Sequence, residues 1–186
     1  MNRLNVTDLP LAGLKLVERR SLSDSRGFLS RLFCAKELSA AGWHKQVAQI
    51  NQSFTAKRGA VRGMHFQLPP HAEMKFVSCL RGRIWDVAVD LREGSDTLLG
   101  WHAEELSAVN QRTLLIPEGF AHGFQTLSDD VELLYCHSAA YHHESQGALN
   151  PRDPKLAIPW PLEITVISDA DTNHPLVEHG FSGFAP

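Results

Sequence analysis

Two residues that could handle a proton and a negative charge lie close together in the sequence. His65 lies in the motif RGMHFQ at residues 62–67, and Lys75 follows ten residues later. Imidazole has the unperturbed pKa nearest to physiological pH, so His65 is a candidate general base. An ammonium such as that of Lys75 stabilises an adjacent oxyanion, commonly by about 3 kcal/mol per well-placed donor. With Arg62 nearby, this set suits proton removal next to a carbonyl of an anionic substrate.

A second histidine and a tyrosine extend this set. His122 lies in PEGFAHGF at residues 117–124, and Tyr135 follows in a strand-like segment. As a phenol, Tyr135 could return a proton to the face opposite the base, although a strand tyrosine is more often a core residue with a tethered hydroxyl. A histidine base also needs an orienting carboxylate, and Asp169 and Asp171 are both candidates. Spacing alone does not choose between them.

Each of these residues also has a purely structural explanation. A strand histidine is more often held by backbone groups than used as a base, and most lysines are solvated, here with Glu73 close in sequence. Side chains alternate along a regular strand, so Arg62 and His65 would lie on opposite faces. The combination of base, cation and phenol nevertheless favours an enzyme.

The composition is typical of a globular protein. The 186 residues suffice for a substantial core, and we expect one domain over residues 1–186. The net charge is −3 with mixed signs, so no basic face indicates nucleic acid. Three scattered cysteines without CxxC spacing indicate reduced thiols and no disulfide framework. Without a signal-peptide pattern or a membrane-length apolar run, we expect a soluble, cytoplasmic protein that does not contact membranes.

Short strand patterns dominate the chain. One helix is predicted over residues 36–41, with Gly42 as its C-cap. Strands are predicted over residues 13–18, 46–52, 76–80, 84–89, 101–106, 112–116, 123–127 and 131–137, with a tight hairpin at 81–83. Strands this short and frequent favour an all-β sandwich or barrel of the jelly-roll kind. The proline-rich stretch 150–161 is expected to wrap this barrel.

The sequence predicts no metal site and no cofactor. Barrel enzymes that hold iron, manganese or zinc commonly show a His-x-His pair, but His65 is followed by Phe66 and Gln67. The adjacent residues of the cluster at 142–144, His-His-Glu, would point to opposite faces of a strand. Glycine-rich phosphate loops and nucleophile elbows are also missing from the sequence.

Several motifs occur in an order typical of one known family. They are DSRGF at 24–28, QIN at 49–51, GAVRGMHFQ at 59–67, WDVAVDLR at 85–92, IPEGFAHGF at 116–124 and LY at 134–135. With them the chain resembles the dTDP-4-dehydrorhamnose 3,5-epimerase family over most of its length, up to Asp171. Its members are metal-free cupins that invert the carbons flanking the 4-keto group of a nucleotide sugar. The resemblance implies a cupin-type jelly-roll barrel, or double-stranded β-helix, and a homodimer built by strand exchange.

The resemblance also implies a role for each matching residue. His65 would be the base and Asp171 the carboxylate that orients it. Lys75 would stabilise the enolate, and Tyr135 would be the acid on the far side of the sugar. The implied substrate-binding residues are Arg26, Gln49, Asn51, Arg62, His122 and Tyr141. Arg62 would lie near the diphosphate, and some nucleotide contacts would cross a dimer interface.

Three positions depart from the family pattern. Arg31 stands where an acidic residue is common, and Pro151-Arg152 replaces a Trp-Asn pair. The paired aromatics after the tyrosine are reduced to Ala140-Tyr141. Such enzymes tend to meet the nucleotide or close over the sugar at these positions, so the resemblance leaves the nucleobase open.

The sequence therefore predicts an epimerase that inverts C3 and C5 of a nucleotide-linked 4-keto-6-deoxyhexose, in its dTDP form, for a cell-surface polysaccharide. A 3-epimerase that inverts only C3 is the second hypothesis, because the same residues serve either outcome. A sugar-nucleotide 3,4-ketoisomerase is more remote, since His65, Lys75 and Tyr135 together favour epimerisation. From a different class, a non-catalytic cupin that binds a sugar or a nucleotide would share the fold.

Overall fold

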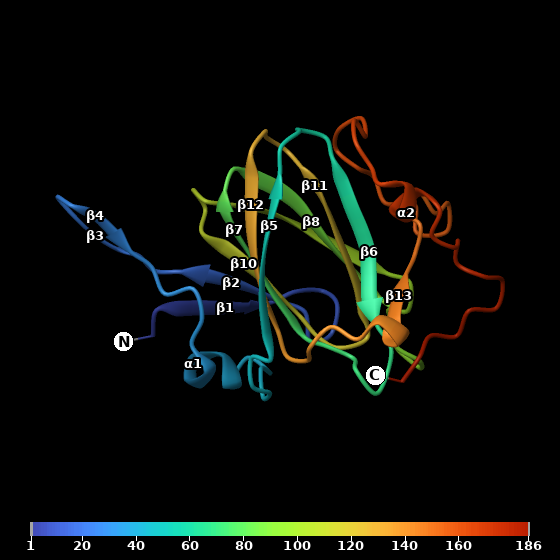
Figure 1. The fold of residues 1–186 in the computed structure, drawn as a ribbon. Helices are drawn as coiled ribbons and strands as arrows, with labels where there is room; N and C mark the ends of the chain where they lie inside the picture. The colour runs from blue at the N-terminus through green and yellow to red at the C-terminus, as the bar shows by residue number, and fades with distance from the viewer. Residues whose placement is uncertain (1, 186) are drawn as a thin grey trace.

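Two antiparallel β-sheets pack face to face and form a barrel (Figure 1). The computed structural model describes residues 2–185, so the predicted domain includes two terminal residues outside this description. The six-stranded sheet has the order β1-β2-β10-β7-β12-β5, with the bounds Leu4–Asp8, Lys15–Arg19, Arg112–Ile116, Lys75–Arg81, Val131–His137 and Gln49–Thr55. The five-stranded sheet has the order β13-β6-β11-β8-β9, with the bounds Gln146–Ala148, Val61–Gln67, Phe120–Thr126, Arg83–Asp90 and Trp101–Ser107. This architecture confirms the predicted all-β jelly-roll barrel of the cupin type.

The remaining elements are short. Strands β3 (Leu22–Asp24) and β4 (Gly27–Leu29) form a hairpin that stands away from the barrel (Figure 1). The helices are α1 (Ala35–Ser39), the 3-10 helix η1 (His143–Ser145) and α2 (Asp169–Thr172). Within residues 2–185, no helix combines the length and the apolar composition needed to span a bilayer.

The main core lies between the two sheets. Buried side chains from both sheets meet there, among them Val77 and Leu133 from one sheet and Ile84 and Phe124 from the other. A second cluster covers the outer face of the five-stranded sheet, where the C-terminal segment packs Leu156 against the strands. Because this sheet is covered on both faces, every residue of β11 is buried. The proline-rich segment 150–161, which was expected to wrap the barrel, packs on this one outer face, and the chain then continues to α2.

Most predicted strands are present, with shifted ends. β10 and β12 begin and end at the predicted residues. β11 begins at Phe120, before the predicted start at residue 123, so His122 lies inside a strand. α1 ends at Ser39, and Gly42, with φ 104°, lies beyond the C-cap residue instead of forming the cap. The sequence does not predict β1, β3, β4 or β13, and the last three have only three residues each, too few to show a periodicity.

An extra residue in β6 changes which of its side chains share a face. His65 pairs with His122 of β11, but Arg62 pairs with Phe124. Three steps along β6 thus match two along β11, which defines a β-bulge. The prediction that Arg62 and His65 lie on opposite faces is therefore wrong, because both line the same cavity. The bulge includes Gly63, where the close approach of β11 leaves no room for a side chain.

Candidate active site

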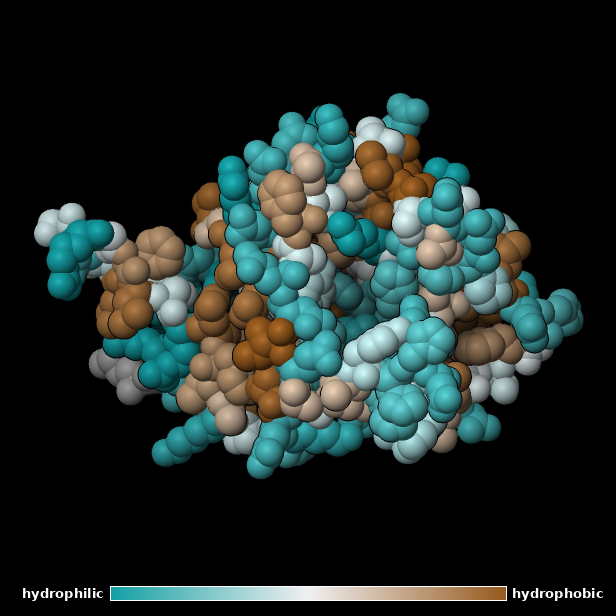
Figure 2. Space-filling model, viewed as in Figure 1, coloured by the Kyte–Doolittle hydropathy of each residue, from teal (hydrophilic) through white to brown (hydrophobic). Residues whose placement is uncertain are grey.

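A cavity of about 790 Å³ opens between the two sheets. Figure 2 shows the surface hollowed near the centre of this face, with hydrophilic residues around the hollow. Strands β5, β6, β7, β11 and β12 line the cavity, together with the residues that lead into α2. Eight of the ten site residues predicted from the sequence line it: Asn51, Arg62, His65, Lys75, His122, Tyr135, Tyr141 and Asp171.

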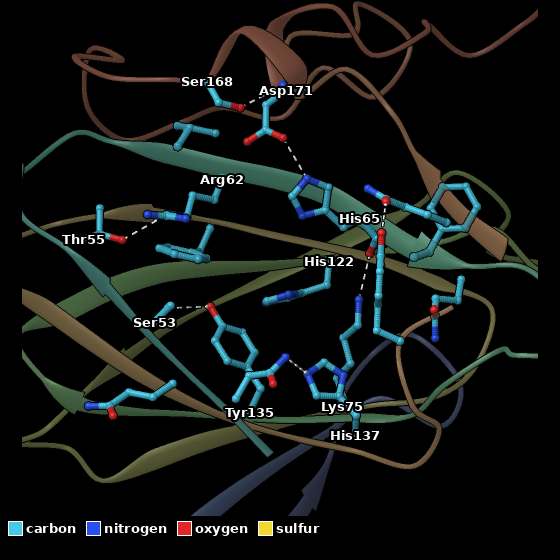
Figure 3. A pocket seen from close by; sticks show the side chains of 18 of the residues that line it. Ser53, Thr55, Arg62, His65, Lys75, His122, Tyr135, His137, Ser168 and Asp171 are labelled. Atoms are coloured by element: carbon cyan, nitrogen blue, oxygen red, sulfur yellow. Dashed lines mark hydrogen bonds and ion pairs between the residues drawn. The ribbon is translucent and has the colours of Figure 1, made fainter. Parts of the chain in front are cut away.

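His65 and Asp171 form a hydrogen-bonded pair, with Nε2 of the histidine 2.8 Å from Oδ1 of the carboxylate (Figure 3). The backbone N–H of Asp171 donates to the Ser168 side chain at 3.0 Å, which fixes the start of α2. Burial alone would raise the pKa of Asp171, but the hydrogen bond and charge of His65 and the Gly63 N–H hold it below its ordinary value. The ionised carboxylate can only accept, so a neutral His65 ring carries its proton on Nε2 and its lone pair on Nδ1.

Lys75 is a buried cation, and the interpretation of it as a solvated charge is wrong. Its side chain is 8% exposed, and its Nζ donates to the His65 carbonyl oxygen at 3.0 Å and lies 3.2 Å from Glu73 Oε1. Glu73 also accepts from Gln67 Nε2 at 3.0 Å, and its Oε2 lies 3.3 Å from His137 Nδ1. Burial favours a higher pKa for Glu73, but His137 and Lys75 outweigh it and lower the pKa. An ammonium has three donors, so one N–H of Lys75 is left for an oxygen in the cavity.

Tyr135 lies across the cavity from His65, because β12 and β6 belong to different sheets (Figure 3). Its hydroxyl and that of Ser53 form a hydrogen bond of 3.2 Å. Burial raises the pKa of the phenol above its usual value, against a lowering effect of the Ser53 hydrogen bond. Tyr135 is therefore protonated at neutral pH and can donate a proton.

A second imidazole–carboxylate pair is more deeply buried. Nε2 of His122 lies 2.7 Å from Oδ1 of Asp86, and both side chains are buried. Burial raises the pKa of Asp86, and the charge and hydrogen bond of His122 oppose this rise. The rings of His122 and Tyr135 meet edge to face with their centroids 6.1 Å apart. Asp86 thus fixes the orientation of an imidazole that lines the cavity between base and phenol.

Arg62 adds a positive charge to the cavity wall. Its Nε donates to Thr55 Oγ1 at 3.1 Å, and its Nη2 donates to the Phe54 carbonyl oxygen at 3.4 Å. A guanidinium has five N–H donors, so Arg62 retains donors for an anionic group.

Two predicted binding residues do not line the cavity of their own chain. Gln49 supports its neighbours: it donates to Asn51 Oδ1 at 3.0 Å and accepts from the Tyr141 backbone N–H at 2.9 Å. Arg26 is exposed on the β3–β4 hairpin and pairs with Asp24 at 2.6 Å. The nucleotide contacts expected for Gln49 and Arg26 stay predictions.

The positions that depart from the family pattern lie outside the cavity wall. Arg31 forms an ion pair with Glu37 of α1. Pro151 is buried in the C-terminal segment, where its carbonyl oxygen accepts from the Trp160 indole at 2.8 Å. Ala140 lies closer, because its carbonyl oxygen accepts from Gln67 Nε2 at 3.2 Å.

Sequence reasoning missed several members of the site. Asp86 could have been predicted as a site residue, because a carboxylate within the apolar strand IWDVAV needs a hydrogen-bonding partner if the strand is buried. The burial of Glu73 and His137 has no signal in the sequence. Asp169 does not line the cavity, so the structure selects Asp171 as the partner of His65.

Comparisons with known proteins agree on one family. The family model described as dTDP-4-dehydrorhamnose 3,5-epimerase matches residues 8–179. The protein of that name from Sinorhizobium fredii is 40% identical over 176 residues, covering 94% of this chain and 90% of its own length. The crystal structure of the Bacillus anthracis protein of that name, with TDP and PPi bound, has a TM-score of 0.90 and 38% identity, covering 94% of this chain and 99% of its own. A Legionella pneumophila epimerase in complex with dTDP-4-keto-L-rhamnose has a TM-score of 0.88 and 38% identity, covering 93% of this chain and 92% of its own.

The buried pair of Glu73 and Lys75 leads to a prediction about stability. Glu73→Gln leaves the Lys75 ammonium without its nearest counter-charge, and we expect it to lower the free energy of unfolding by about 3 kcal/mol. Lys75→Met removes that ammonium, so the double variant should lose less stability than the sum of the single variants, by about 1 kcal/mol or more. Urea unfolding of the four proteins at pH 7 measures this coupling. Additive losses would show that the two side chains do not interact.

Proposed function

Because this chain belongs to the dTDP-4-dehydrorhamnose 3,5-epimerase family, we propose that it inverts C3 and C5 of the 4-keto-6-deoxyhexose in a dTDP-linked sugar. The reaction would convert dTDP-4-dehydro-6-deoxy-D-glucose into dTDP-4-dehydro-L-rhamnose. One observation carries the proposal: the His65–Asp171 pair, the Lys75 ammonium and the Tyr135 phenol line one cavity from two facing sheets.

In this proposal His65 is the general base. The ketone at C4 acidifies the C–H bonds at C3 and C5, and Nδ1 of His65 accepts the proton. Asp171 holds the other ring nitrogen as N–H and stabilises the imidazolium that forms. The electron pair of the broken C–H bond forms a C=C double bond to C4, and the carbonyl π pair moves to the C4 oxygen, which gives the enolate.

Lys75 and Tyr135 complete the inversion. The free N–H of Lys75 donates to the C4 oxygen, and this interaction strengthens as the oxygen becomes negative, in a cavity wall that excludes water from the ammonium. Tyr135 delivers its proton from the opposite face of the ring, so that removal and return take place on different sides. Both carbons flank the same C4 oxygen, so one enolate-stabilising group serves both centres.

The nucleotide would lie along the cavity wall formed by β5 and the start of β6. Arg62 offers charge and free donors to the diphosphate, and Asn51 and Tyr141 line the cavity nearby. We further propose that residues 1–186 act as one domain, because both sheets and the C-terminal segment contribute to this cavity. The cytoplasmic location and the supply of a polysaccharide precursor stay predictions.

Deuterium exchange tests the function directly. We expect the protein to incorporate solvent deuterium at both C3 and C5 of dTDP-4-keto-6-deoxyglucose in deuterated water, as followed by proton NMR. Label at C3 alone would replace the proposal with a 3-epimerase. No label at either carbon would indicate a binding protein without catalysis.

Two variants separate the roles of base and acid. His65→Asn should slow exchange at both carbons by about 10²–10⁴-fold, because no other group takes the proton. Tyr135→Phe should still allow exchange but yield little inverted product, because the proton then returns to the face it left. The same substitution at a distant histidine, His102→Asn, serves as the control, since His102 pairs with Glu104 outside the cavity. Wild-type exchange in His65→Asn, or full product yield in Tyr135→Phe, would refute the respective role.

We also propose that the protein is a homodimer. The β3–β4 hairpin exposes Leu22, Phe28 and Leu29 on an arm that stands away from the barrel (Figure 1). β5 is one of the two edge strands of the six-stranded sheet and exposes Ile50 and Phe54. An open strand edge beside apolar side chains is a surface that a second copy can cover, and strand exchange would bring each arm to the partner's barrel.

Sedimentation equilibrium tests the dimer. We expect twice the mass of the 20.7 kDa chain for the wild type. Replacing Phe28 and Leu29 with serine should produce monomers, because it removes the apolar surface of the arm. Val109→Ser, at a still more exposed apolar residue in the turn after β9, should leave the mass unchanged. A monomeric wild type would contradict the proposal.

A further inference from the structure

His174 is an imidazole next to the catalytic pair that the proposed reaction does not use. Its Nε2 lies 3.2 Å from Asp171 Oδ1, the same oxygen that His65 Nε2 contacts at 2.8 Å. This Nε2 is buried, yet it has no hydrogen-bond partner among the described residues. The two imidazole rings meet edge to face, with their centroids 5.6 Å apart. His174 thus places a second imidazole nitrogen close to the carboxylate oxygen that His65 contacts.

We propose that His65, Asp171 and His174 bind a divalent cation of the zinc type, and that this ion inhibits the enzyme. The three donor atoms lie within 4.8 Å of one another. Zinc–ligand bonds of about 2.0–2.1 Å in a tetrahedron place neighbouring donors about 3.3 Å apart. The two nitrogen–oxygen separations of 2.8 and 3.2 Å are close to that value, so small side-chain shifts admit an ion.

The chemistry of the donors suits zinc. Two neutral imidazoles and one carboxylate form a ligand set that zinc accepts, with a water in the fourth position. The α2 helix holds Asp171 through the Ser168 cap, and the Gly63 backbone N–H donates to its second oxygen, Oδ2, at 3.3 Å. The carboxylate is therefore already oriented before an ion arrives, as a ligand with outer-sphere hydrogen bonds should be.

Inhibition follows from the tautomer of His65. A neutral imidazole carries one proton, and in the reaction Asp171 keeps this proton on Nε2, so that Nδ1 is free to act as base. An ion can bind Nε2 only through a lone pair on that nitrogen. The single proton of the neutral ring must then move to Nδ1. The nitrogen that faces the sugar then has no lone pair, although the rest of the cavity is unchanged. Zinc should therefore lower kcat more than it raises KM.

The ion in this proposal is an inhibitor and not a cofactor, because it removes the base on which the reaction depends. The inhibition rests on the proposed epimerase function, whereas the binding of the ion rests only on the three donors. The two parts therefore need separate measurements.

Binding is measured first, on the EDTA-treated full chain without substrate. We expect one equivalent of Zn²⁺ in calorimetric titration, and Co²⁺ in its place should give the visible absorption of a tetrahedral site. His174→Gln keeps a polar side chain of similar reach but lacks the imidazole, and it should weaken the affinity for Zn²⁺ by at least about tenfold. His143→Gln, at an exposed histidine of η1 outside the cluster, should bind as the wild type does. Equal affinity of wild type and His174→Gln would overturn the site.

Inhibition is measured second, as the ratio of initial rates with and without Zn²⁺ for each protein, so that any change in basal rate cancels. The wild type and His143→Gln should lose at least about tenfold in kcat and recover it with EDTA, and His174→Gln should need at least about tenfold more zinc for the same loss. Zinc that binds without slowing the reaction would refute the inhibition. A protein that binds zinc but lacks epimerase activity without it would refute the proposed function and leave the site standing.

Discussion

The contact between Asp171 and His65 is the interaction on which the site depends, because it joins the C-terminal segment to the barrel. The carboxylate comes from α2, more than 100 residues along the chain from the histidine. It decides which ring nitrogen carries the proton, and therefore whether the imidazole is a base toward the cavity. The packing of the C-terminal segment on the outer face of the five-stranded sheet holds α2 in place, so the outer core supports the chemistry inside.

Buried charge organises the opposite wall of the cavity. Lys75 is held between the His65 carbonyl oxygen and Glu73, and Glu73 in turn contacts His137. A buried ammonium with these partners has few other orientations, and low solvent access strengthens its effect on an oxyanion. His122 and Asp86 form a second such contact, and both of their side chains are buried. In each of these contacts a carboxylate orients a neighbouring imidazole or ammonium in the cavity wall.

Much of the fold and part of the site could be predicted from local patterns. Alternation and turn residues place β10 and β12 correctly, because those strands are regular and well bounded. The same rule fails at β6, where the bulge at Gly63 brings Arg62 and His65 to one face. A bulge depends on how a neighbouring strand pairs, so the residues of β6 alone do not predict it. Three-residue elements such as β13 escape prediction because they are too short to show a periodicity.

The amino-acid sequence was enough to predict a base, a cation, a phenol and a short-strand jelly roll, and it contains motifs that resemble one family of epimerases. Residue type and order along the chain suffice for those inferences. The folded structure adds that Asp171 and not Asp169 reaches His65, that Glu73 is buried beside Lys75, and that His174 approaches the Asp171 carboxylate. The contact of Asp171 with His65 joins segments far apart in the sequence, and packing decides the burial and side-chain orientation of Glu73, Lys75 and His174. Packing depends on the whole fold, so it cannot be predicted from the local spacing of residues in the sequence.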